Sequence, residues 1–361
     1  MKILFLTGCI NQIGGIERVA LDVIKILKSA KHEVSIISYS KASGDGFPEL
    51  SNHDVVYLNK KPISIRYSFL KAGKLRKTVN ELNPDFIVYV DSFLYLFFRP
   101  FIPKKYKQIV WEHFNYTTTF GTRSRTWARK YAAATADACV LLTEADAAMW
   151  RENCRCNAEI KVIPNPVRED VLAASRERAD SLLKRKKQIL FVGRLARQKQ
   201  VPELVEIWSL VEKNHPQWEL VIVGDGDERP LVEERIRKHD LQRVRLIGKT
   251  TDVFLYYRES QILVLSSAFE GLPLVLIEGL FFDLPEVSFD CPCGPEEIIE
   301  DGKNGFIIKD FDKIRFAEKL SELMGNDKMR EEFSVCSKEL SKKYLPENIL
   351  PQWEKLFEKI K

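Results

Sequence analysis

The chain has 361 residues, of which 45% are hydrophobic and 30% are charged, and its formal net charge is +5. This length indicates two domains, because single hydrophobic cores stop growing at roughly 250–300 residues. The ordinary composition excludes collagen-like, mucin-like and long disordered segments, and no apolar stretch reaches the roughly 18 residues that a membrane-spanning helix needs.

Short apolar, β-branched runs alternate with amphipathic stretches along the whole chain. The first half contains six such runs, at residues 2–7, 34–39, 54–58, 86–91, 108–112 and 138–143. The second half contains six more, at residues 188–193, 219–224, 244–248, 262–266, 286–290 and 305–309. Near-continuous apolar strands separated by helices are typical of parallel sheets that are covered on both faces.

This pattern predicts an α/β protein with two doubly wound, Rossmann-like domains. We place the N-terminal domain at residues 1–168, a linker at residues 169–187 and the C-terminal domain at residues 188–342. Residues 343–361 are predicted to form an amphipathic helix that is a candidate for packing back on the N-terminal domain.

Positive charge is concentrated in the first half. Residues 55–136 contain 15 Lys and Arg and only four acids, a net charge of +11, which leaves −6 for the rest of the chain. Aromatic residues are interleaved with these cations, which favours an anionic membrane surface as a partner. A solvated face over a core and a surface that stacks nucleic acid bases are the alternatives, and we expect no nucleic acid partner.

Within this basic region, residues 58–82 are predicted to form a loop that runs into a helix. An apolar stripe at three- and four-residue steps would face inward, formed by Ile65, Phe69, Ala72, Leu75 and Val79. The hypothesis is that another side of the helix docks on anionic lipid and presents an acceptor, with aromatic residues at the headgroup boundary. The residues assigned to this surface are Lys71, Lys74, Lys77, Phe97, Phe98 and Arg99.

Loops after the predicted strands are candidates for ligand contacts, because open parallel sheets bind ligands beyond the carboxyl ends of their strands. Gly14 and Gly15 open a helix and permit close approach of a phosphate or sugar, although a tight turn also explains them. Arg194 and Lys199 follow another strand and could clamp a diphosphate, although basic loop residues are common.

A third loop, at residues 224–230, looks like half of a dinucleotide fingerprint. Its third glycine is missing, because Arg229 stands there, and residues 38–41 offer no acid for a ribose hydroxyl. Both observations weaken the prediction of an NAD site.

The strongest pattern is a pair of acids, Glu270 and Glu278, with seven residues between them. Pro273 suits the first turn of a helix, so Glu270 lies in the loop before it and Glu278 lies inside. Their separation would be about 12 Å in a continuous helix, whereas a retaining pair of carboxylates acting across one glycosidic bond needs about 5 Å. We therefore expect the two acids to hold the two ends of a long ligand that carries vicinal hydroxyls.

At these residues the chain resembles the family 4 retaining glycosyltransferases of the GT-B fold, over nearly its whole length. The specific motifs are Glu270 with Glu278, the loop from Gly193 to Lys199, and residues 288–299, which resemble members that build bacterial surface polysaccharides and lipid-linked oligosaccharides. The resemblance implies a nucleotide-sugar donor on the C-terminal domain and an acceptor on the N-terminal domain.

Carried over residue by residue, the resemblance assigns roles to individual side chains. Arg194 and Lys199 would neutralise the leaving diphosphate, Glu270 would contact the donor sugar, and Glu278 would contact the ribose. His113 would lie near the transferred sugar, although a lone His is often structural. The remaining donor contacts would be Gly14, Gly15, Gly248, Lys249, Thr250, Gly271, Leu272, Pro273 and Leu274.

We therefore expect a cytoplasmic, peripheral, metal-independent retaining glycosyltransferase on the inner face of the plasma membrane. It would move a hexose or N-acetylhexosamine from a nucleotide-diphosphate sugar, with UDP favoured, to a growing lipid-linked surface glycan, with no cofactor. The alternatives are a nucleotide-dependent oxidoreductase of another doubly wound class and a membrane-associated protein that binds nucleotide sugars without transfer.

Glu286 departs from the family pattern, which places an apolar residue in that strand. A buried unpaired carboxylate would cost several kcal/mol or be protonated, so Glu286 either reaches a partner or lowers stability.

Overall fold

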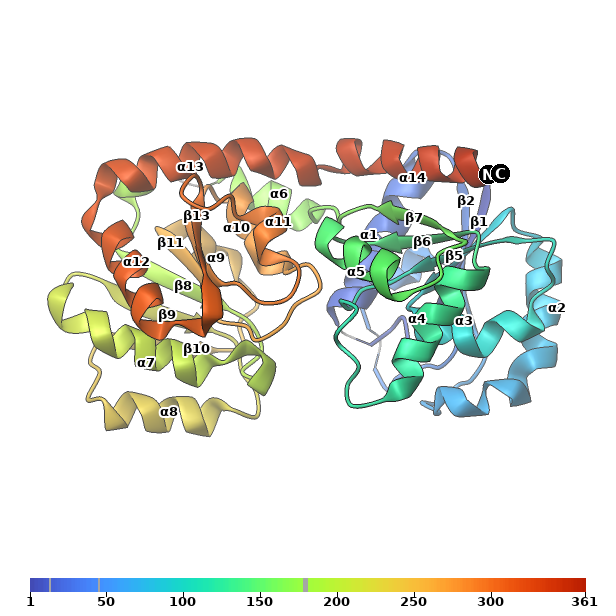
Figure 1. Ribbon diagram of the computed structural model, residues 1–361, viewed down its shortest axis with the longest axis horizontal. Coiled ribbons are helices and arrows are strands. Elements are labelled where there is room, and N and C mark those ends of the chain that lie inside the picture. Colours follow the sequence, from blue (N-terminus) through green and yellow to red (C-terminus); the bar gives the residue numbers. More distant parts are fainter. Residues whose placement is uncertain (13, 45, 178–180) are drawn as a thin grey trace. The chain divides into compact units, whose positions relative to one another are not determined.

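The computed structural model describes residues 1–12, 14–44, 46–177 and 181–361. The chain divides into two units, each with its own parallel sheet (Figure 1). The N-terminal unit consists of Met1–Pro166 together with Pro346–Lys361, and the C-terminal unit consists of Val167–Leu345. The predicted α/β architecture of two Rossmann-like domains is confirmed.

The N-terminal sheet has seven parallel strands in the order β3-β2-β1-β4-β5-β6-β7. Their bounds are β1 Lys2–Thr7, β2 Glu33–Ser38, β3 Val55–Tyr57, β4 Phe86–Val90, β5 Lys107–Trp111, β6 Ala138–Leu141 and β7 Glu159–Val162. The strand order reverses between β1 and β4, so loops after these two strands diverge at the carboxyl edge of the sheet.

Among the residues that the structure describes, six α-helices accompany this sheet, and those that follow β4, β5 and β6 pack side by side. The helices are α1 Gly15–Ser29, α2 Ala72–Leu82, α3 Ser92–Phe98, α4 Arg123–Thr135, α5 Glu144–Asn153 and α14 Pro346–Ile360. Although α14 is the last element of the chain, it belongs to this unit: Trp353 packs on Trp111 with ring centroids 5.2 Å apart, and Phe357 packs on Phe86 at 4.8 Å. The apolar face of this amphipathic helix explains the packing.

The C-terminal sheet has six parallel strands in the order β10-β9-β8-β11-β12-β13. Their bounds are β8 Gln188–Val192, β9 Glu219–Val223, β10 Val244–Gly248, β11 Ile262–Leu265, β12 Glu286–Phe289 and β13 Gly305–Ile308. Here the strand order reverses between β8 and β11, which pair directly.

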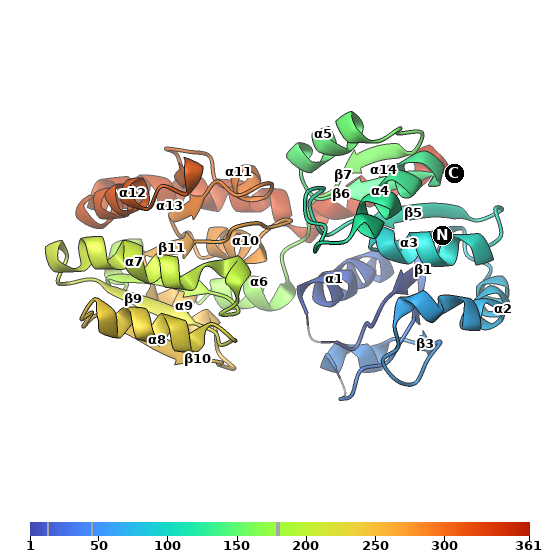
Figure 2. The same cartoon turned by 60° about the horizontal axis from the view of Figure 1, so that its bottom comes forward.

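Helix α7 packs against α8, which lies beside it in Figure 2, and also against α12. Helix α10 packs against α6 and α13. The bounds of the helices of this unit are α6 Glu169–Ser175, α7 Val201–Val211, α8 Arg229–Lys238, α9 Phe254–Glu259, α10 Leu274–Phe281, α11 Pro295–Ile298, α12 Lys313–Gly325 and α13 Asp327–Ser341. Crossovers that run in opposite directions from β8 and β11 place helices on both faces of the sheet.

Three details differ from the expectations. The described part of the segment predicted as a linker, residues 169–177 and 181–187, lies in the C-terminal unit, where α6 packs against α9 and α10. Residues 178–180 of that segment lie outside the described residues. Strand β7 was missed because its sequence alternates charged and apolar residues and it lies half-buried at the sheet edge. Residues 65–71 form a separate 3₁₀ helix, η2 Ile65–Lys71, which is kinked at Tyr67.

Candidate functional site

A cavity of 810 Å³ lies at the carboxyl edge of the C-terminal sheet. Loops that follow β8, β9 and β10 form it, and the predicted donor contacts Arg194, Gly248, Lys249 and Thr250 line its wall. The full set of lining residues is Val192, Gly193, Arg194, Val223, Gly224, Asp225, Gly226, Asp227, Gly248, Lys249, Thr250 and Val253. This is the edge at which open parallel sheets bind their ligands.

The glycines of the loop after β9 are required by packing between neighbouring loops. A Cβ atom at Gly224, which has a φ of 137°, would lie 1.9 Å from the carbonyl oxygen of Gly193. A Cβ at Gly226 would lie 2.3 Å from the carbonyl oxygen of Leu195. The likeness of this loop to a dinucleotide fingerprint therefore has a packing explanation.

Lys199 and Glu270 form an ion pair at the point where the strand order reverses. Nζ of Lys199 lies 2.6 Å from Oε1 of Glu270, and both side chains are largely buried. The two loops that carry them are also joined elsewhere: Ser266 donates a hydrogen bond from Oγ to the carbonyl oxygen of Lys199. The amide of Ala268 donates to the carbonyl oxygen of Gln198. The structure thus brings together two residues that lie far apart in the sequence.

Glu278 lies inside α10, where it is held by two residues that the sequence did not single out. Its Oε2 accepts a hydrogen bond of 2.8 Å from the hydroxyl of Tyr257, and its Oε1 lies 3.3 Å from Nη1 of Arg168. Burial raises the pKa of Glu278, and Arg168 and Tyr257 oppose that shift. No local pattern could have found these partners, because Arg168 lies 110 positions away along the chain.

The segment between the two acids forms the start of α10. Pro273 is the N-cap of this helix and makes no side-chain capping bond, and Leu272 is buried. Gly294 packs so closely that a Cβ there would lie 2.8 Å from the carbonyl oxygen of Gly271. The first amides of a helix have no intrahelical partner, so the predicted contacts from Gly271 to Leu274 lie where an anion is favoured.

The other predicted donor contacts, Gly14, Gly15 and His113, belong to the N-terminal unit. Gly14 is the N-cap of α1 and Gly15 is its first residue. Oε2 of Glu17 lies 2.5 Å from the place that a Cβ of Gly14 would occupy. The absence of a side chain at position 14 therefore leaves room for the Glu17 carboxylate at the start of the helix.

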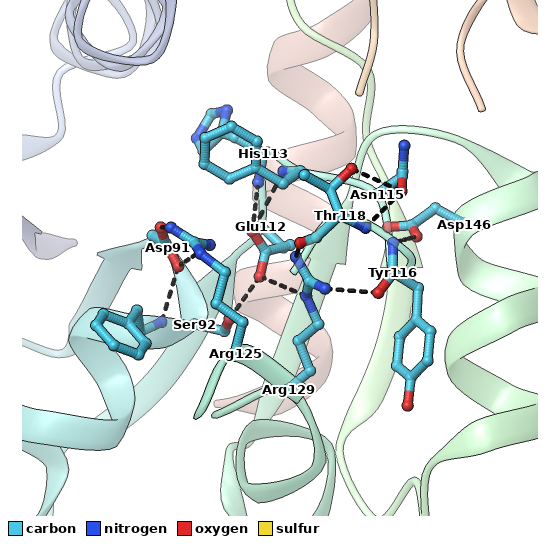
Figure 3. Close-up of polar contacts among 12 residues, drawn as sticks. Asp91, Ser92, Glu112, His113, Asn115, Tyr116, Thr118, Arg125, Arg129 and Asp146 are labelled. Carbon is cyan, nitrogen blue, oxygen red and sulfur yellow. Dashed lines mark hydrogen bonds and ion pairs between the residues drawn. The ribbon is translucent and has the colours of Figure 1, made fainter. Parts of the chain in front are cut away.

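His113 follows β5 and is positioned by a buried ionic network (Figure 3). The amides of His113 and Phe114 both donate to Oε1 of Glu112 at 3.2 Å. Nε of Arg129 lies 3.3 Å from Oε2 of Glu112, and both of these side chains are fully buried. Arg129 also donates to the carbonyl oxygens of Tyr116 and Thr118. One guanidinium thereby fixes the loop on which His113 lies.

The charge state of His113 follows from its surroundings. Burial lowers the pKa of His113 to about 4, and the nearby Glu112 opposes that shift only partly. Its ring lies 4.4 Å from that of Trp111, measured between centroids, and its buried Nε2 has no hydrogen-bond partner among the described residues. A neutral imidazole with an unpaired nitrogen suits hydrogen bonding to a sugar hydroxyl.

Asp91 and Asp146 complete the network and were missed by the sequence analysis. Asp91 directly follows β4 in a left-handed conformation, with a φ of 118°, and forms an ion pair of 3.0 Å with Arg125. Burial, followed by the charge of Glu112, raises the pKa of Asp91 to about 6. Burial raises the pKa of Asp146 to about 7. A carboxylate directly after a strand at the reversal of strand order was the signal that could have indicated Asp91.

The residues assigned to the lipid-facing surface differ in exposure: Lys74 and Lys77 are exposed, and the others are half-buried or buried. Phe98 is fully buried and packs on Tyr39 with centroids 5.4 Å apart, so its assignment to a headgroup boundary is wrong. Phe97 packs on Phe93 at 5.0 Å. Arg99 lines a cavity of the N-terminal unit, together with residues of α2 and α4.

The predicted inward stripe is also wrong at one position, because Phe69 is 58% exposed, whereas Leu75 and Val79 are buried. Phe69 lies in η2, where three residues per turn change which positions face the core. Exposed beside it are Ile63, Tyr67 and Leu70, and Lys74 and Lys77 project from the adjoining α2.

Two findings concern metals and membranes. Among the described residues, no group of three or more His, Cys, Asp or Glu side chains is arranged to hold a metal ion. In the same part of the chain, no helix has the length and hydropathy that crossing a membrane requires.

Comparisons with known proteins agree with this geometry. Residues 13–171 match the family model described as Glycosyltransferase Family 4, and residues 174–339 match the model described as Glycosyl transferases group 1. An uncharacterized glycosyltransferase of Haemophilus influenzae is 32% identical over 98% of this chain and 99% of its own length. An N-acetylgalactosaminyltransferase of Campylobacter jejuni, whose name specifies a saccharide on PP-undecaprenol, is 28% identical over 100% of this chain and 99% of its own.

Among solved structures, TarM of Staphylococcus aureus, determined with UDP, has a TM-score of 0.81 at 17% identity. The match covers 99% of this chain and 100% of that one. Two doubly wound parallel sheets with polar and charged side chains at their carboxyl edges define the GT-B class of glycosyltransferases. Within that class, this chain belongs to glycosyltransferase family 4. This membership excludes the oxidoreductase alternative.

Proposed function

We propose that this glycosyltransferase moves a hexose or N-acetylhexosamine from a UDP-sugar to a growing lipid-linked surface glycan, with retention of configuration and without a metal ion. The observation that carries the proposal is the Lys199–Glu270 ion pair at the reversal of strand order, beside the cavity that Arg194 lines. The preference for UDP is supported by TarM, which was determined with UDP, and the lipid-linked acceptor by the name of the Campylobacter jejuni relative.

The proposed chemistry follows from the charges that develop in the reaction. The bond between the anomeric carbon and the diphosphate oxygen breaks, and its electron pair stays on the diphosphate. The acceptor hydroxyl forms the new glycosidic bond, and its proton passes to the departing diphosphate oxygen. Lys199 and Arg194 stabilise the negative charge on the diphosphate, and the N-terminal amides of α10 add their dipoles. Two positioned cations can perform the neutralisation that a divalent ion performs elsewhere, which supports a metal-independent reaction.

The two acids have distinct roles in this proposal. Glu270 accepts hydrogen bonds from hydroxyls of the donor sugar, and Glu278 accepts them from the ribose. Arg168 and Tyr257 orient Glu278 and leave part of its acceptor capacity unused, because a carboxylate has about four lone-pair sites. Ordered in this way, Glu278 loses little conformational entropy when the nucleotide binds.

The N-terminal unit is proposed to dock on the inner face of the plasma membrane. Exposed Ile63, Tyr67, Phe69 and Leu70 adjoin Lys71, Lys74 and Lys77. Apolar side chains beside lysines are typical of interfacial segments that insert among anionic headgroups. This surface differs from the one expected from the sequence, because η2 supplies its apolar part and Phe98 does not contribute.

The test of the function is a thermal-shift screen of nucleotide sugars followed by a transfer assay. A donor at about 100 times its dissociation constant should raise the free energy of unfolding by about 2.7 kcal/mol. The donor found should then be consumed in the presence of a lipid-linked saccharide, and NMR of the product should show the anomeric configuration of the donor. Donor binding with no product on any such acceptor would favour a protein that binds nucleotide sugars without transfer, and an inverted product would contradict retention.

A further inference from the structure

A second cavity, of 720 Å³, lies within the N-terminal unit. Its wall comes from three separate parts of the chain: helix α2, the segment between α3 and β5, and the last turns of α4. The lining residues are Arg76, Arg99, Pro100, Phe101, Ile102, Pro103, Lys104, Tyr131 and Thr135.

This cavity lies at the amino edge of the sheet. Lys104 precedes the start of β5 by three residues, and Thr135 precedes the start of β6 by three. Asp91, in contrast, directly follows β4, and His113 comes two residues after the end of β5, so both lie at the carboxyl edge. The cavity is therefore separate from the proposed reaction site, and the assigned function does not use it.

The charge of the lining residues is entirely positive. Arg76, Arg99 and Lys104 contribute three cations, and no carboxylate lines the cavity. None of these three forms an ion pair with any residue that the structure describes. The C-terminal end of α4 carries about half a negative charge from its helix dipole, which opposes an anion but is outweighed by three full cations. The field inside the cavity therefore favours an anion.

The cavity is also built from ordered parts. Nη1 of Arg99 donates to the carbonyl oxygen of Ile102 at 3.1 Å, which fixes the guanidinium and leaves other N–H groups to donate. Pro100 and Pro103 restrict the backbone of the same segment. An arginine held in this way binds a phosphate with little further loss of entropy.

One wall is aromatic. Tyr131 packs on Tyr95 with ring centroids 5.5 Å apart, and the hydroxyl of Tyr95 shares a hydrogen bond of 3.0 Å with Oγ1 of Thr135. Phe101 contributes a second ring to the lining. Aromatic rings beside cations suit a ligand in which an anionic group is attached to a sugar or another partly apolar body.

We propose that this cavity binds a phosphate or diphosphate group, carried by a sugar or by a lipid. Two guanidinium groups and an ammonium group match phosphate oxygens better than a single carboxylate, because each arginine can donate two parallel hydrogen bonds. The site lies in a different unit from the donor cavity, and its occupation does not depend on the proposed donor or acceptor.

Calorimetric titration with inorganic pyrophosphate tests the site. The test variant is Arg76→Ala/Lys104→Ala, whose two side chains are exposed at the cavity rim. The matched control is Lys105→Ala/Lys130→Ala, which removes the same charge from exposed positions next to Lys104 and Tyr131 but outside the lining. Both are made in the background Arg194→Ala/Lys199→Ala, so that pyrophosphate bound at the proposed donor site does not contribute.

We expect the background protein and the control to bind pyrophosphate equally. The test variant should bind it at least about tenfold more weakly, because two charged hydrogen-bonding groups are lost. Equal binding by test and control variants, or no binding by the background protein, would overturn the proposal. Failure of the donor assignment would give a different result: the Arg194→Ala/Lys199→Ala variant would bind the nucleotide as tightly as the wild-type protein does.

Vesicles separate the two sources of the phosphate. Phosphatidylcholine vesicles containing phosphatidic acid are mixed with the test and control variants and sedimented. Reduced binding of the test variant only, reversed by pyrophosphate, would support the site with a lipid as the carrier. Equal binding by both variants, together with loss of soluble pyrophosphate binding in the test variant alone, would support the site with a soluble carrier.

Discussion

Nζ of Lys199 lies 2.6 Å from Oε1 of Glu270, so two residues assigned to different parts of one ligand contact each other directly. Removing two charges from water carries a desolvation cost, and each ion offsets that cost for the other. The pair also holds both side chains in place before a donor binds. Such prior ordering is the condition under which fixed charges stabilise a developing charge most strongly.

The two acids should respond differently to neutralisation. Glu278→Gln should weaken UDP binding by about ten- to a hundredfold, because a charged hydrogen-bond acceptor for the ribose is lost. Glu270→Gln should weaken binding of the sugar donor but not of UDP, since it frees Lys199 for the diphosphate. Titration calorimetry with UDP and with the intact donor measures both effects. Tyr257→Phe keeps the charge of Glu278 but removes one orienting hydrogen bond, so it should weaken UDP binding less than Glu278→Gln does. Equal weakening of UDP binding by the two acid variants would contradict the assignment.

Activity should survive an excess of EDTA, because Lys199 and Arg194 supply the positive charge beside the diphosphate. Lys199→Met should lower the turnover number by about a hundred- to a thousandfold, the range measured when one group that stabilises a transition-state charge is removed. Initial rates of sugar transfer with and without EDTA are the measurement. Loss of activity in EDTA that manganese or magnesium restores would refute this expectation.

Binding to anionic vesicles should depend on the lysines of the N-terminal unit. The triple change Lys71→Glu/Lys74→Glu/Lys77→Glu should abolish it at moderate salt, because each cation near such a surface contributes about 1 kcal/mol. Folding and donor binding should be nearly unaffected. A matched control reverses three exposed lysines of the C-terminal unit instead, at Lys328, Lys338 and Lys342. Vesicle sedimentation measures the difference, and a wild-type protein that ignores anionic vesicles even at low salt would rule out the docking surface.

Glu286 should destabilise the C-terminal unit. Its side chain is fully buried in β12, and neither carboxylate oxygen has a hydrogen-bond partner among the described residues. Glu286→Met, which has an unbranched side chain of similar length, should raise the free energy of unfolding by about 1–3 kcal/mol. Chemical denaturation of both proteins at neutral pH measures this change, and a less stable variant would show that the carboxyl has a role in the fold.

The same residue predicts a dependence on pH. Burial raises the pKa of Glu286 well above its ordinary value of 4.5, so the folded state keeps the proton while the unfolded chain loses it above that pH. The unfolded state then binds fewer protons, and stability falls by up to about 1.4 kcal/mol per pH unit as pH rises. Asp91 and Asp146, whose pKa values are also raised, shift stability in the same direction. The difference in stability between Glu286→Met and wild type should therefore grow as pH rises above about 4.5, and a constant difference would contradict a raised pKa.

Local patterns determined the architecture and the chemical character of the site. Near-continuous apolar runs that alternate with amphipathic stretches are typical of parallel sheets covered on both faces, so the two doubly wound domains could be predicted from the sequence alone. The spacing of Glu270, Pro273 and Glu278 fixed one acid in a loop and the other inside a helix, as α10 has them. Both inferences depend only on residues that are close along the chain.

The tertiary structure decided which groups meet. Lys199 reaches Glu270 across 71 positions, and Arg168 reaches Glu278 across 110, because β8 lies beside β11 and residues 167–175 pack near α10. The same holds for the burial of Phe98, the exposure of Phe69 and the assembly of the second cavity from three segments. Periodicity shows that a helix or strand has an apolar side. Only packing against elements that are distant in the sequence determines which of its side chains become buried and which charged side chains meet.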